Sequence, residues 1–412
     1  MIDRTRRCLL FMIFLLLSAM LAQATDPLHT LHSGSLRPSP PSLSARSAIL
    51  VEARTGVILF ENNADDPIPP ASLAKLMTLH IVLQRIEEGR LDPSQIVVPE
   101  PDAWARNMPP RSSVMLLGPN QRLTIDDLLK GLVVDSANDA AVELADVVAG
   151  SVPAFADMMN EETLRMGYRV MHFVDSSGLS SANVITAREY ADFCRRFVTL
   201  HSQALTSLFL LRRFTYPRGE NLSGNDYQKP VTHQNTDTLL GRYEGADGLK
   251  TGYIDESGYN FAATARRGEM RLISVILGIR DPDPAVGLRL RAVESEKLLD
   301  YGFTNFCLVV PTYVAPSQVR VWKGRARTLT IALFAKPYIV VPRGQTESVS
   351  TSLEQQREVI APIAQGQVLG HLIVRLGVVE LVRFPLQAVS SDGMGGPLQR
   401  TIDSVILLFH RI

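Results

Sequence analysis

Apolar and polar positions near the start of the chain predict a β-hairpin followed by a buried helix. Two apolar runs within residues 47–63 flank a polar turn at 54–56, which is the pattern of two paired strands. Three prolines between positions 67 and 70 then precede a segment from Ser72 to Glu88 that Gly89 closes, as is typical of a helix. Because this segment is apolar on nearly every side, the helix should lie in the middle of a domain.

The rest of the pattern predicts a layered α+β domain and then a small β domain. Strands come first, helices lie in the middle and further strands come last. This order favours a layered α+β arrangement over alternating βαβ units. From about residue 308 onward, short β runs separated by Gly and Pro predict a separate β-sandwich-like domain over 308–389. The expected helices cover 124–149, 153–166, 186–199 and 285–303, and the expected strands cover 259–265 and 270–279.

The last residues, 390–412, predict a hinge and an amphipathic helix. Residues 390–396 are rich in glycine, so we expect them to detach the helix from the fold. The helix is too short and too polar to span a bilayer, and its terminal position suits a helix that lies in a membrane interface. The alternative is a helix packed against its own protein. One side carries Leu398, Ile402, Val405, Ile406, Leu408, Phe409 and Ile412, and the polar side carries one exception, Leu407.

The amino terminus has the pattern of a secretory signal peptide. Arginines precede a short apolar run, and a small-x-small cleavage signal ends at Ala24, so we expect residues 1–24 to be removed on export. The alternative is an uncleaved membrane anchor. Residues 25–43, rich in Ser, Pro and His, should form a flexible linker, which leaves residues 44–307 for the main domain.

Composition and charge narrow the classes of function. Hydrophobic residues make up 46% and charged residues 20% of the 412 residues, and the formal net charge is zero, so nothing suggests a nucleic-acid-binding protein. Cys8 would leave with the signal peptide. Cys194 and Cys307 are expected to be buried thiols, although an oxidising compartment would also allow them to pair. Neither a metal-ligand cluster nor a phosphate-binding loop stands out, so we expect no metal and no cofactor.

A serine and a lysine three residues apart form the first candidate catalytic pair. Ser72 and Lys75 would lie on one face of the expected helix. Ser72 would occupy the first turn, where unpaired N–H groups and the helix dipole favour negative charge. A buried lysine has a lowered pKa and, as a neutral amine, can take the serine proton. Alternatively, Ser72 is only a helix cap and Lys75 reaches out to solvent.

Two further motifs carry side chains that suit the same chemistry. Ser136-Ala137-Asn138 falls at a break between apolar helical stretches, so a hydroxyl and an amide can face one cleft; it can equally form a helix cap or an Asx turn. Lys250-Thr251-Gly252 offers a positive charge, a hydroxyl and a glycine that lets a ligand approach the backbone, if it begins an edge strand. The alternative is a turn that enters a strand.

In this order, the three motifs resemble the signature of the low-molecular-mass penicillin-binding proteins, the serine-type D-alanyl-D-alanine carboxypeptidases of peptidase family S11. The resemblance implies a penicillin-binding/β-lactamase-like transpeptidase domain, an antiparallel sheet flanked by helices, followed by an all-β domain and an amphipathic C-terminal helix. Further stretches that carry the likeness are 111–117, 138–151, 175–179, 234–240 and 258–260.

The resemblance also implies catalytic roles. Ser72 would attack the carbonyl between the two terminal D-alanines of a peptidoglycan pentapeptide, with Lys75 as the base. Ser136 would relay the proton to the departing D-alanine, and Asn138 would hold the peptide and support Lys75. β-Lactams would acylate the same serine, and the enzyme would act in the periplasm, in cell wall biogenesis and cell shape, attached to the membrane surface by its C-terminus.

Substrate-binding roles follow from the same resemblance. Lys250 and Thr251 would bind the terminal carboxylate beside Gly252, and Arg280 would add positive charge. The N–H groups of Ser72 and Tyr253 would form the oxyanion hole. Tyr253 departs from the family pattern, in which a smaller or an imidazole side chain is common, and its ring could reshape the substrate rim.

Three alternatives stand beside this hypothesis. A serine β-lactamase shares the motifs but needs a carboxylate that activates the deacylating water, for which Glu143, Glu161 and Glu162 are candidates. A D,D-endopeptidase would act on cross-links with the same residues. A non-catalytic peptidoglycan-binding scaffold would keep the fold without the activity.

Overall fold

The computed structural model describes residues 28–30, 38–222, 228–314 and 317–410. It divides into a larger unit, which holds Ser39–Thr304, and a smaller unit, which holds Asn305–Ile412. The expected signal peptide and parts of the expected linker lie outside the described residues. Within that linker, His29–Thr30 form strand β1, which pairs in parallel with β3.

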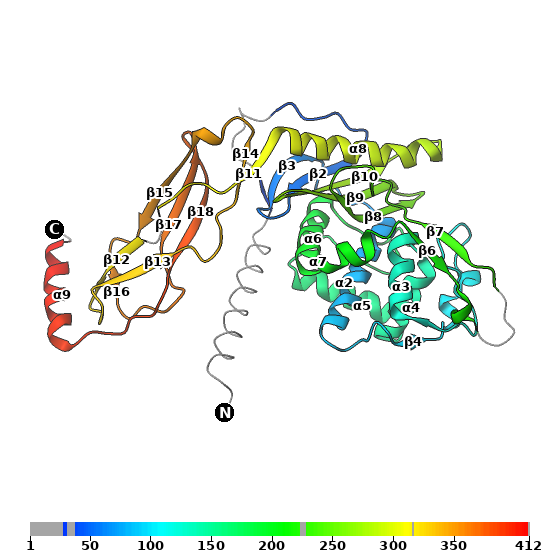
Figure 1. Ribbon diagram of the computed structural model, residues 1–412, viewed down its shortest axis with the longest axis horizontal. Helices are drawn as coiled ribbons and strands as arrows, with labels where there is room; N and C mark the ends of the chain where they lie inside the picture. The colour runs from blue at the N-terminus through cyan, green and yellow to red at the C-terminus, as the bar shows by residue number, and fades with distance from the viewer. Residues whose placement is uncertain (1–27, 31–37, 223–227, 315–316, 411–412) are drawn as a thin grey trace. The chain divides into compact units, whose positions relative to one another are not determined.

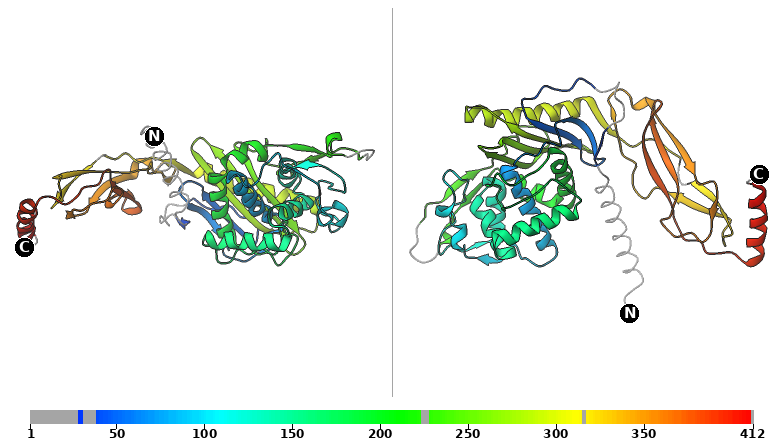
Figure 2. Two further views of the ribbon diagram at one scale, coloured as in Figure 1. Left: turned by 90° about the horizontal axis from the view of Figure 1, so that it is seen from below. Right: turned by 180° about the vertical axis from the view of Figure 1, so that it is seen from behind.

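The larger unit is built on one sheet with the strand order β1-β3-β2-β10-β9-β8. All pairs except β1 with β3 are antiparallel, and β8 is an edge strand. Figure 1 and Figure 2 show the long helix α8 on one face of this sheet and the other helices of the unit on the opposite face. The main strands are β2 (Ser47–Glu52), β3 (Val57–Asn62), β8 (Ala246–Ile254), β9 (Gly258–Arg267) and β10 (Met270–Ile279).

The predicted layered α+β arrangement is therefore confirmed. The helices are α2 (Lys75–Glu87), α3 (Ile125–Lys130), α4 (Asn138–Ala149), α5 (Val152–Arg165), α6 (Ala187–Leu200), α7 (Ser202–Ala204) and α8 (Pro284–Asn305). Short two-stranded pairs, β4 (Ile96–Val97) with β5 (Leu123–Thr124) and β6 (Arg213–Tyr216) with β7 (Val231–Gln234), extend the helical side.

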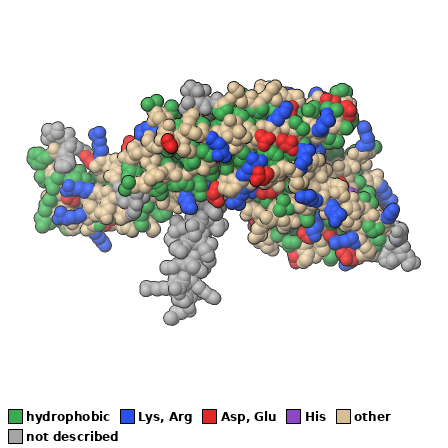
Figure 3. Space-filling view, turned by 45° about the horizontal axis from the view of Figure 1, so that its top comes forward, with side chains coloured by type: hydrophobic (Ala, Val, Ile, Leu, Met, Phe, Trp, Pro, Cys, Tyr) green, Lys and Arg blue, Asp and Glu red, His purple; other side chains and the backbone are tan. Residues whose placement is uncertain are grey.

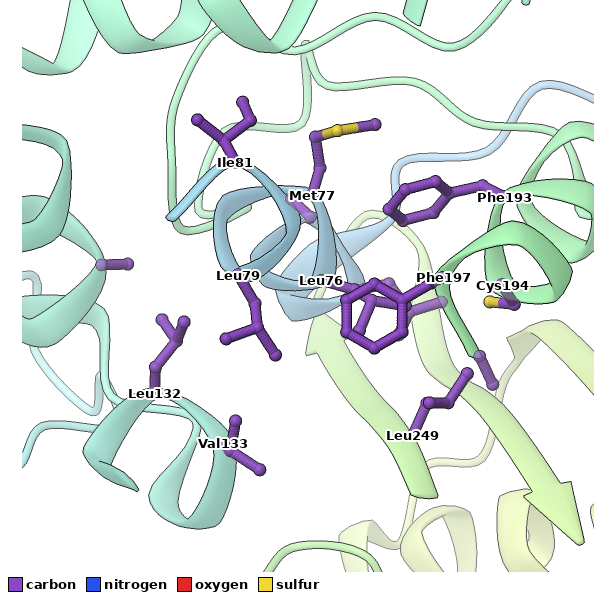
Figure 4. Close-up of a cluster of buried hydrophobic side chains, with 14 of the residues drawn as sticks. Leu76, Met77, Leu79, Ile81, Leu132, Val133, Phe193, Cys194, Phe197 and Leu249 are labelled. Carbon is purple, nitrogen blue, oxygen red and sulfur yellow. The ribbon is translucent and has the colours of Figure 1, made fainter. Parts of the chain in front are cut away.

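Helix α2 lies in the middle of the core, as its pattern predicts. Figure 4 shows its side chains pointing in several directions toward α6, the strand β8 and the segment after α3. Leu76 and Leu79 are each only 1% exposed, and Phe193 and Phe197 of α6 pack against them with no exposed surface. Because the helix is held on all sides, side chains at its start have fixed positions.

The helical stretch 124–149 is divided at the second motif, where the sequence pattern predicts a break. Helix α3 ends in a π-helical turn, Gly131–Asp135, and α4 begins only at Asn138. Ser136 ends the turn in the left-handed conformation with φ +61°, which few residues other than glycine adopt. Strain of this kind is found mostly at functional sites.

The smaller unit is a β domain with a six-stranded sheet and a two-stranded partner. The sheet order is β15-β17-β18-β13-β12-β16, and β11 pairs with β14. Ile339 and Val341 of β14 share one apolar cluster with Leu372 and Val374 of β17. The strands are β11 (Phe306–Val309), β12 (Ser317–Trp322), β13 (Thr328–Ala332), β14 (Ile339–Pro342), β15 (Val349–Gln355), β16 (Val359–Ile360), β17 (Val368–Leu376) and β18 (Val379–Ala388).

The glycine-rich segment 390–396 is fastened to this β domain and does not form a free hinge. Asp392 exchanges two backbone hydrogen bonds with Ile363, at 2.8 and 3.0 Å. The N–H of Gly395 donates to the carbonyl of Lys323 at 2.8 Å. These bonds hold the chain before and within the glycine-rich segment, so the helix that follows has a fixed starting point.

One side of the terminal helix α9 (Pro397–His410) packs against the β domain. The N–H of Lys323 donates to Oδ2 of Asp403 at 2.6 Å, and Leu407, one turn further on, is only 6% exposed. The exception in the sequence pattern is therefore the residue that docks the helix. Figure 3 shows hydrophobic side chains at the surface of this end of the chain. The exposed apolar residues are Leu398, Ile402, Val405, Leu408 and Phe409.

No helix among the described residues has the length and apolar character that crossing a membrane requires. The two described cysteines, Cys194 and Cys307, are both free thiols, and Cys194 is completely buried in α6.

Candidate active site

Lys75 and Ser72 meet at the amino-terminal end of the buried helix. The Lys75 Nζ lies 2.8 Å from Oγ of Ser72, 2.6 Å from Oδ1 of Asn138 and 2.7 Å from the carbonyl oxygen of Ser177. An ammonium group has three N–H donors, and these three contacts use all of them. The lysine is 1% exposed, so it does not reach out to solvent.

The same three contacts decide where the lone pair of a neutral Lys75 would point. The carbonyl of Ser177 can only accept a hydrogen bond, and so can the Oδ1 of Asn138. The hydroxyl of Ser72 can donate as well as accept. When the lysine loses a proton, only Ser72 can therefore face the lone pair, and its O–H becomes the donor. This is the arrangement that proton abstraction from Ser72 requires.

The pKa of Lys75 suits this role. Burial lowers the pKa to about 7, although the carboxylates of Asp175, Asp139 and Asp135 act in the opposite direction. Near neutral pH a substantial fraction of the enzyme then carries the free amine. A catalytic base works best when its pKa lies near the operating pH.

Backbone packing fixes the position of Ser72. The residue belongs to a 3₁₀ turn, Ala71–Ala74, that precedes α2, so the regular helix begins at Lys75, three residues later than expected. Ala71 has φ +51°. A Cβ on Gly178 would lie 1.8 Å from the carbonyl oxygen of Ala71, so a glycine is required there. A Cβ on Gly252 would lie 3.1 Å from the Ser72 nitrogen, which places β8 directly beside the serine.

The second motif lies on the other side of Lys75. Asn138 opens α4, and its N–H donates to the carbonyl of Ser113 at 2.8 Å. The buried carboxylate of Asp139 accepts N–H groups from Met115 and Leu117, each at 3.0 Å, and so holds the neighbouring loop. Ser136 is 4% exposed, and its hydroxyl has no hydrogen-bond partner among the described residues. The hydroxyl therefore has donor and acceptor capacity left for a ligand.

The third motif lies in the middle of β8 and not at its start. Lys250 is 3% exposed, and its Nζ donates to the carbonyl of Thr251 at 3.1 Å. Burial, followed by the positive charges of Lys75 and Arg291, lowers the pKa of Lys250, and the carboxylate of Asp237 opposes this. The hydroxyl of Thr251 donates to that of Thr236 at 2.8 Å.

Arg291 is a candidate that sequence reasoning missed. It lies on α8, is 8% exposed, and its Nη1 is 3.5 Å from the carbonyl oxygen of Gly252. Its charge acts on both Lys250 and the buried carboxyl of Asp237, whose pKa burial raises to about 6. The sequence pattern does not set Arg291 apart, because the same buried face of α8 also carries the polar residues Glu294 and Ser295.

Arg280 lies elsewhere. Its guanidinium donates to the carbonyl of Asp255 at 3.2 Å and also to that of Glu256, in the turn between β8 and β9. This turn is five residues beyond Lys250, roughly 16 Å along the strand at about 3.3 Å per residue. The expected role of Arg280 beside Lys250 therefore fits Arg291 better.

The carbonyl of Ser177 is the second contact that sequence reasoning missed. Asp175 organises this turn: its Oδ1 accepts the N–H groups of Ser177 and Gly178 at 2.7 and 2.5 Å. Although burial raises the pKa of Asp175, the hydrogen bonds outweigh it and lower that pKa below its ordinary value. The stretch 175–179 carries part of the family likeness, but the sequence does not show that a backbone oxygen is its contribution.

Of the three carboxylates considered for a deacylating base, two are engaged elsewhere and the third is exposed. Glu143 accepts the N–H of Glu100 at 3.0 Å. Glu162 is paired with His80 at 2.8 Å and with Arg165 at 2.6 Å, and Glu161 is an exposed residue of α5. None of them contacts Ser72 or Lys75 among the described residues, so the structure gives no support to the β-lactamase alternative.

Comparison with known proteins agrees with this geometry. The family model described as D-alanyl-D-alanine carboxypeptidase, peptidase S11, matches residues 35–281, and the model of the penicillin-binding protein 5 C-terminal domain matches residues 310–392. The chain is 32% identical to D-alanyl-D-alanine carboxypeptidase DacC of Escherichia coli over 381 residues, which is 90% of each chain. It is 31% identical to DacA of the same organism over 386 residues, again 90% of each.

Solved structures extend the likeness to the fold. The crystal structure of penicillin-binding protein 5 from Haemophilus influenzae superimposes with a TM-score of 0.78 and 30% identity, covering 86% of this chain and 99% of that one. Penicillin-binding protein 6B from Escherichia coli gives a TM-score of 0.69 with 28% identity. By sequence and by fold, the chain belongs to the D-alanyl-D-alanine carboxypeptidases of peptidase family S11, with the C-terminal domain of penicillin-binding protein 5.

Proposed function

We propose that Ser72 is the nucleophile of this serine-type D-alanyl-D-alanine carboxypeptidase and that it removes the terminal D-alanine of peptidoglycan stem peptides. The observation that carries the proposal is the contact between Lys75 Nζ and Ser72 Oγ at 2.8 Å, with both other acceptors of the amine fixed. In the first step the Ser72 oxygen attacks the carbonyl of the penultimate D-alanine while its proton passes to Lys75.

The leaving D-alanine needs a proton on its nitrogen. Ser136 is buried two residues before Asn138, whose Oδ1 contacts Lys75, and its hydroxyl is uncommitted, so we assign to it the transfer of the proton from Lys75 to that nitrogen. We assign the oxyanion hole to the N–H groups of Ser72 and Tyr253, since Gly252 of β8 lies directly beside the serine. Water, activated by the regenerated neutral Lys75, then hydrolyses the acyl-enzyme and restores Ser72.

We assign Lys250 and Arg291 as the basic side chains that bind the terminal carboxylate of the substrate. Lys250 and Arg291 are both buried, and the hydroxyl of Thr251, which donates to that of Thr236, can exchange this contact for one with the substrate. When Lys75 is neutral, its repulsion on Lys250 disappears, which favours a charged Lys250. The site can therefore hold one neutral and one charged lysine side by side, as base and as anion receptor.

A matched pair of serine variants tests this proposal. Ser72→Ala should abolish labelling by a fluorescent penicillin and D-alanine release from a D-Ala-D-Ala peptide, while thermal unfolding stays near wild type. Ser207→Ala, an exposed serine whose hydroxyl donates to the carbonyl of Gln203, should leave both activities unchanged. Retained D-alanine release in Ser72→Ala would refute the assignment.

We also propose that the enzyme works in the periplasm and attaches to the membrane surface through α9. Support comes from the exposed apolar side of α9, which lies opposite the side that docks on the β domain. An amphipathic helix of this kind binds at the headgroup boundary of a bilayer. The amino-terminal signal pattern agrees with export but lies outside the described residues.

A further inference from the structure

A cavity of about 270 Å³ lies beside the residue that follows the Lys-Thr-Gly motif. Tyr253 and Tyr259 form an aromatic wall, with ring centroids 4.4 Å apart and planes inclined by 32°. Asp255, Arg280 and Asp281 add charges of both signs to the lining. The catalytic proposal uses only the backbone of Tyr253, so its 46% exposed ring has no role in it.

The polar groups of this cavity are held in place. The hydroxyl of Tyr253 donates to Oδ1 of Asp255 at 2.7 Å, and this bond raises the pKa of Tyr253 to about 12, so the hydroxyl stays a donor at neutral pH. Arg280 uses two of its five N–H groups on the backbone carbonyls of the same turn. Among the described residues, Oδ2 of Asp255 accepts no hydrogen bond, so this oxygen and the remaining N–H groups of Arg280 are available to a ligand.

The direction of the substrate along β8 leads to this cavity. With its terminal carboxylate at Lys250 and its reacting carbonyl at the N–H of Tyr253, the peptide follows the free edge of β8 toward the end of the strand. Extended peptides commonly add to an exposed sheet edge in this way. The residue before the two D-alanines then lies next to Tyr253 and Asp255, one peptide unit beyond the oxyanion hole.

We propose that this cavity is the subsite for the side chain of that residue, and that it selects a side chain ending in both an ammonium and a carboxylate group. The two tyrosine rings cover the methylene groups, Asp255 and Asp281 receive the ammonium, and Arg280 receives the carboxylate. A side chain with an amine alone leaves Arg280 without its partner, and a neutral side chain uses none of the charges. The ring that departs from the family pattern is thus a specificity determinant.

Three pentapeptides that differ only in this residue test the subsite, with meso-2,6-diaminopimelate, L-lysine or L-norleucine before D-Ala-D-Ala. We expect kcat/KM for D-alanine release to fall in that order, by about threefold to fivefold at each step, the size of a partly exposed ion pair. Asp255→Asn should reduce the difference between lysine and norleucine, because only Asp281 is left to receive the ammonium group. Arg280→Gln should remove the difference between diaminopimelate and lysine.

Glu244→Gln is the matched control, because this exposed carboxylate lies just before the opposite end of β8 and should leave both differences intact. If Asp255→Asn does not fold, Tyr253→Phe serves instead, since it keeps the ring but removes the hydroxyl that orients Asp255. Equal kcat/KM for the three peptides, or any other order, would overturn the subsite. The inference rests on the proposed substrate orientation, but release of D-alanine from none of the peptides would instead refute the proposed function.

Discussion

Nδ1 of His80 lies 2.7 Å from Nε2 of His201 in the interior of the larger unit. The outer nitrogens of the two rings contact carboxylates, Glu162 and Glu87, each at 2.8 Å. A carboxylate can only accept, so both outer nitrogens carry protons, and the contact between the rings needs a third proton. The pair therefore holds one positive charge between two negative ones, and it ties α2 to α5 and to the end of α6. Burial, followed by the charge of His80, lowers the pKa of His201.

We expect His201→Phe to destabilise the larger unit by about 1 to 3 kcal/mol, because it leaves a buried ring nitrogen of His80 without its hydrogen-bond partner. Urea unfolding followed by fluorescence measures this. The chain has two tryptophans, Trp104 and Trp322, one in each unit, so a Trp322→Phe background reports the larger unit alone. His172→Gln, at an exposed histidine, is the control. Equal midpoints for both variants would contradict the role of the pair.

Acylation should depend on pH through Lys75. Since its pKa is about 7 and the neutral amine is the base, the rate of penicillin acylation should rise with pH through 7 and fall about tenfold per unit below it. Asp135→Asn removes a carboxylate that raises the pKa of Lys75, so the acid limb should move to lower pH. Lys75→Ala should lower the rate by about 10²- to 10⁴-fold. A rate that is constant from pH 5 to pH 8 would exclude Lys75 as the titrating base.

Alanine variants of two glycines with similar φ angles distinguish the positioning of Ser72 from conformational strain of the backbone. Gly178 and Gly167 have φ +82° and +87°, but a Cβ on Gly178 would overlap the carbonyl of Ala71, whereas a Cβ on Gly167 would meet open space. Gly167→Ala should cost about 1 kcal/mol of stability without changing acylation. Gly178→Ala should displace the turn that carries Ser72 and slow acylation by at least tenfold. Thermal unfolding and stopped-flow acylation by a fluorescent penicillin distinguish the two effects.

Arg291 should contribute to binding of the substrate carboxylate. We expect Arg291→Gln to lower kcat/KM for D-Ala-D-Ala release by about 10- to 100-fold, the range for a charge-assisted hydrogen bond of about 1.5 to 3 kcal/mol. Arg289→Gln, at an exposed arginine of the same helix, is the matched control and should act like wild type. If both variants retain full kcat/KM, Arg291 does not contribute to binding of the substrate carboxylate, and Lys250 alone supplies the positive charge.

Adjacent leucines on α9 should have different roles. Leu408→Ser, on the exposed side, should weaken sedimentation with vesicles of mixed zwitterionic and anionic lipids, because about 66% of its surface is exposed. Leu407→Ser, at the docked side, should loosen the helix from the β domain and raise its proteolysis, with a smaller effect on vesicle binding. Deletion of 397–412 should release the enzyme from vesicles with D-alanine release unchanged. A deletion variant that still sediments would argue against the anchor.

Several features of this protein follow from the sequence because they depend on residues close together in the chain. The spacing of Ser72 and Lys75 predicts that the two side chains meet near the start of a helix, and the apolar residues around that helix predict its burial. The hairpin, the two strands before α8 and the separate β domain follow from strand alternation and turns in the same way. The three motifs in order are specific enough to indicate the family.

Tertiary structure decided what depends on segments far apart in the chain. Arg291 and not Arg280 reaches Gly252 because α8 packs across the sheet, and the carbonyl of Ser177 reaches Lys75 only through the fold of a distant turn. Glycines at 390–396 suggested a hinge, yet their neighbours bind the β domain. Local spacing fixes which face of an element a residue occupies, whereas its partners depend on how the elements pack, which a single sequence does not show.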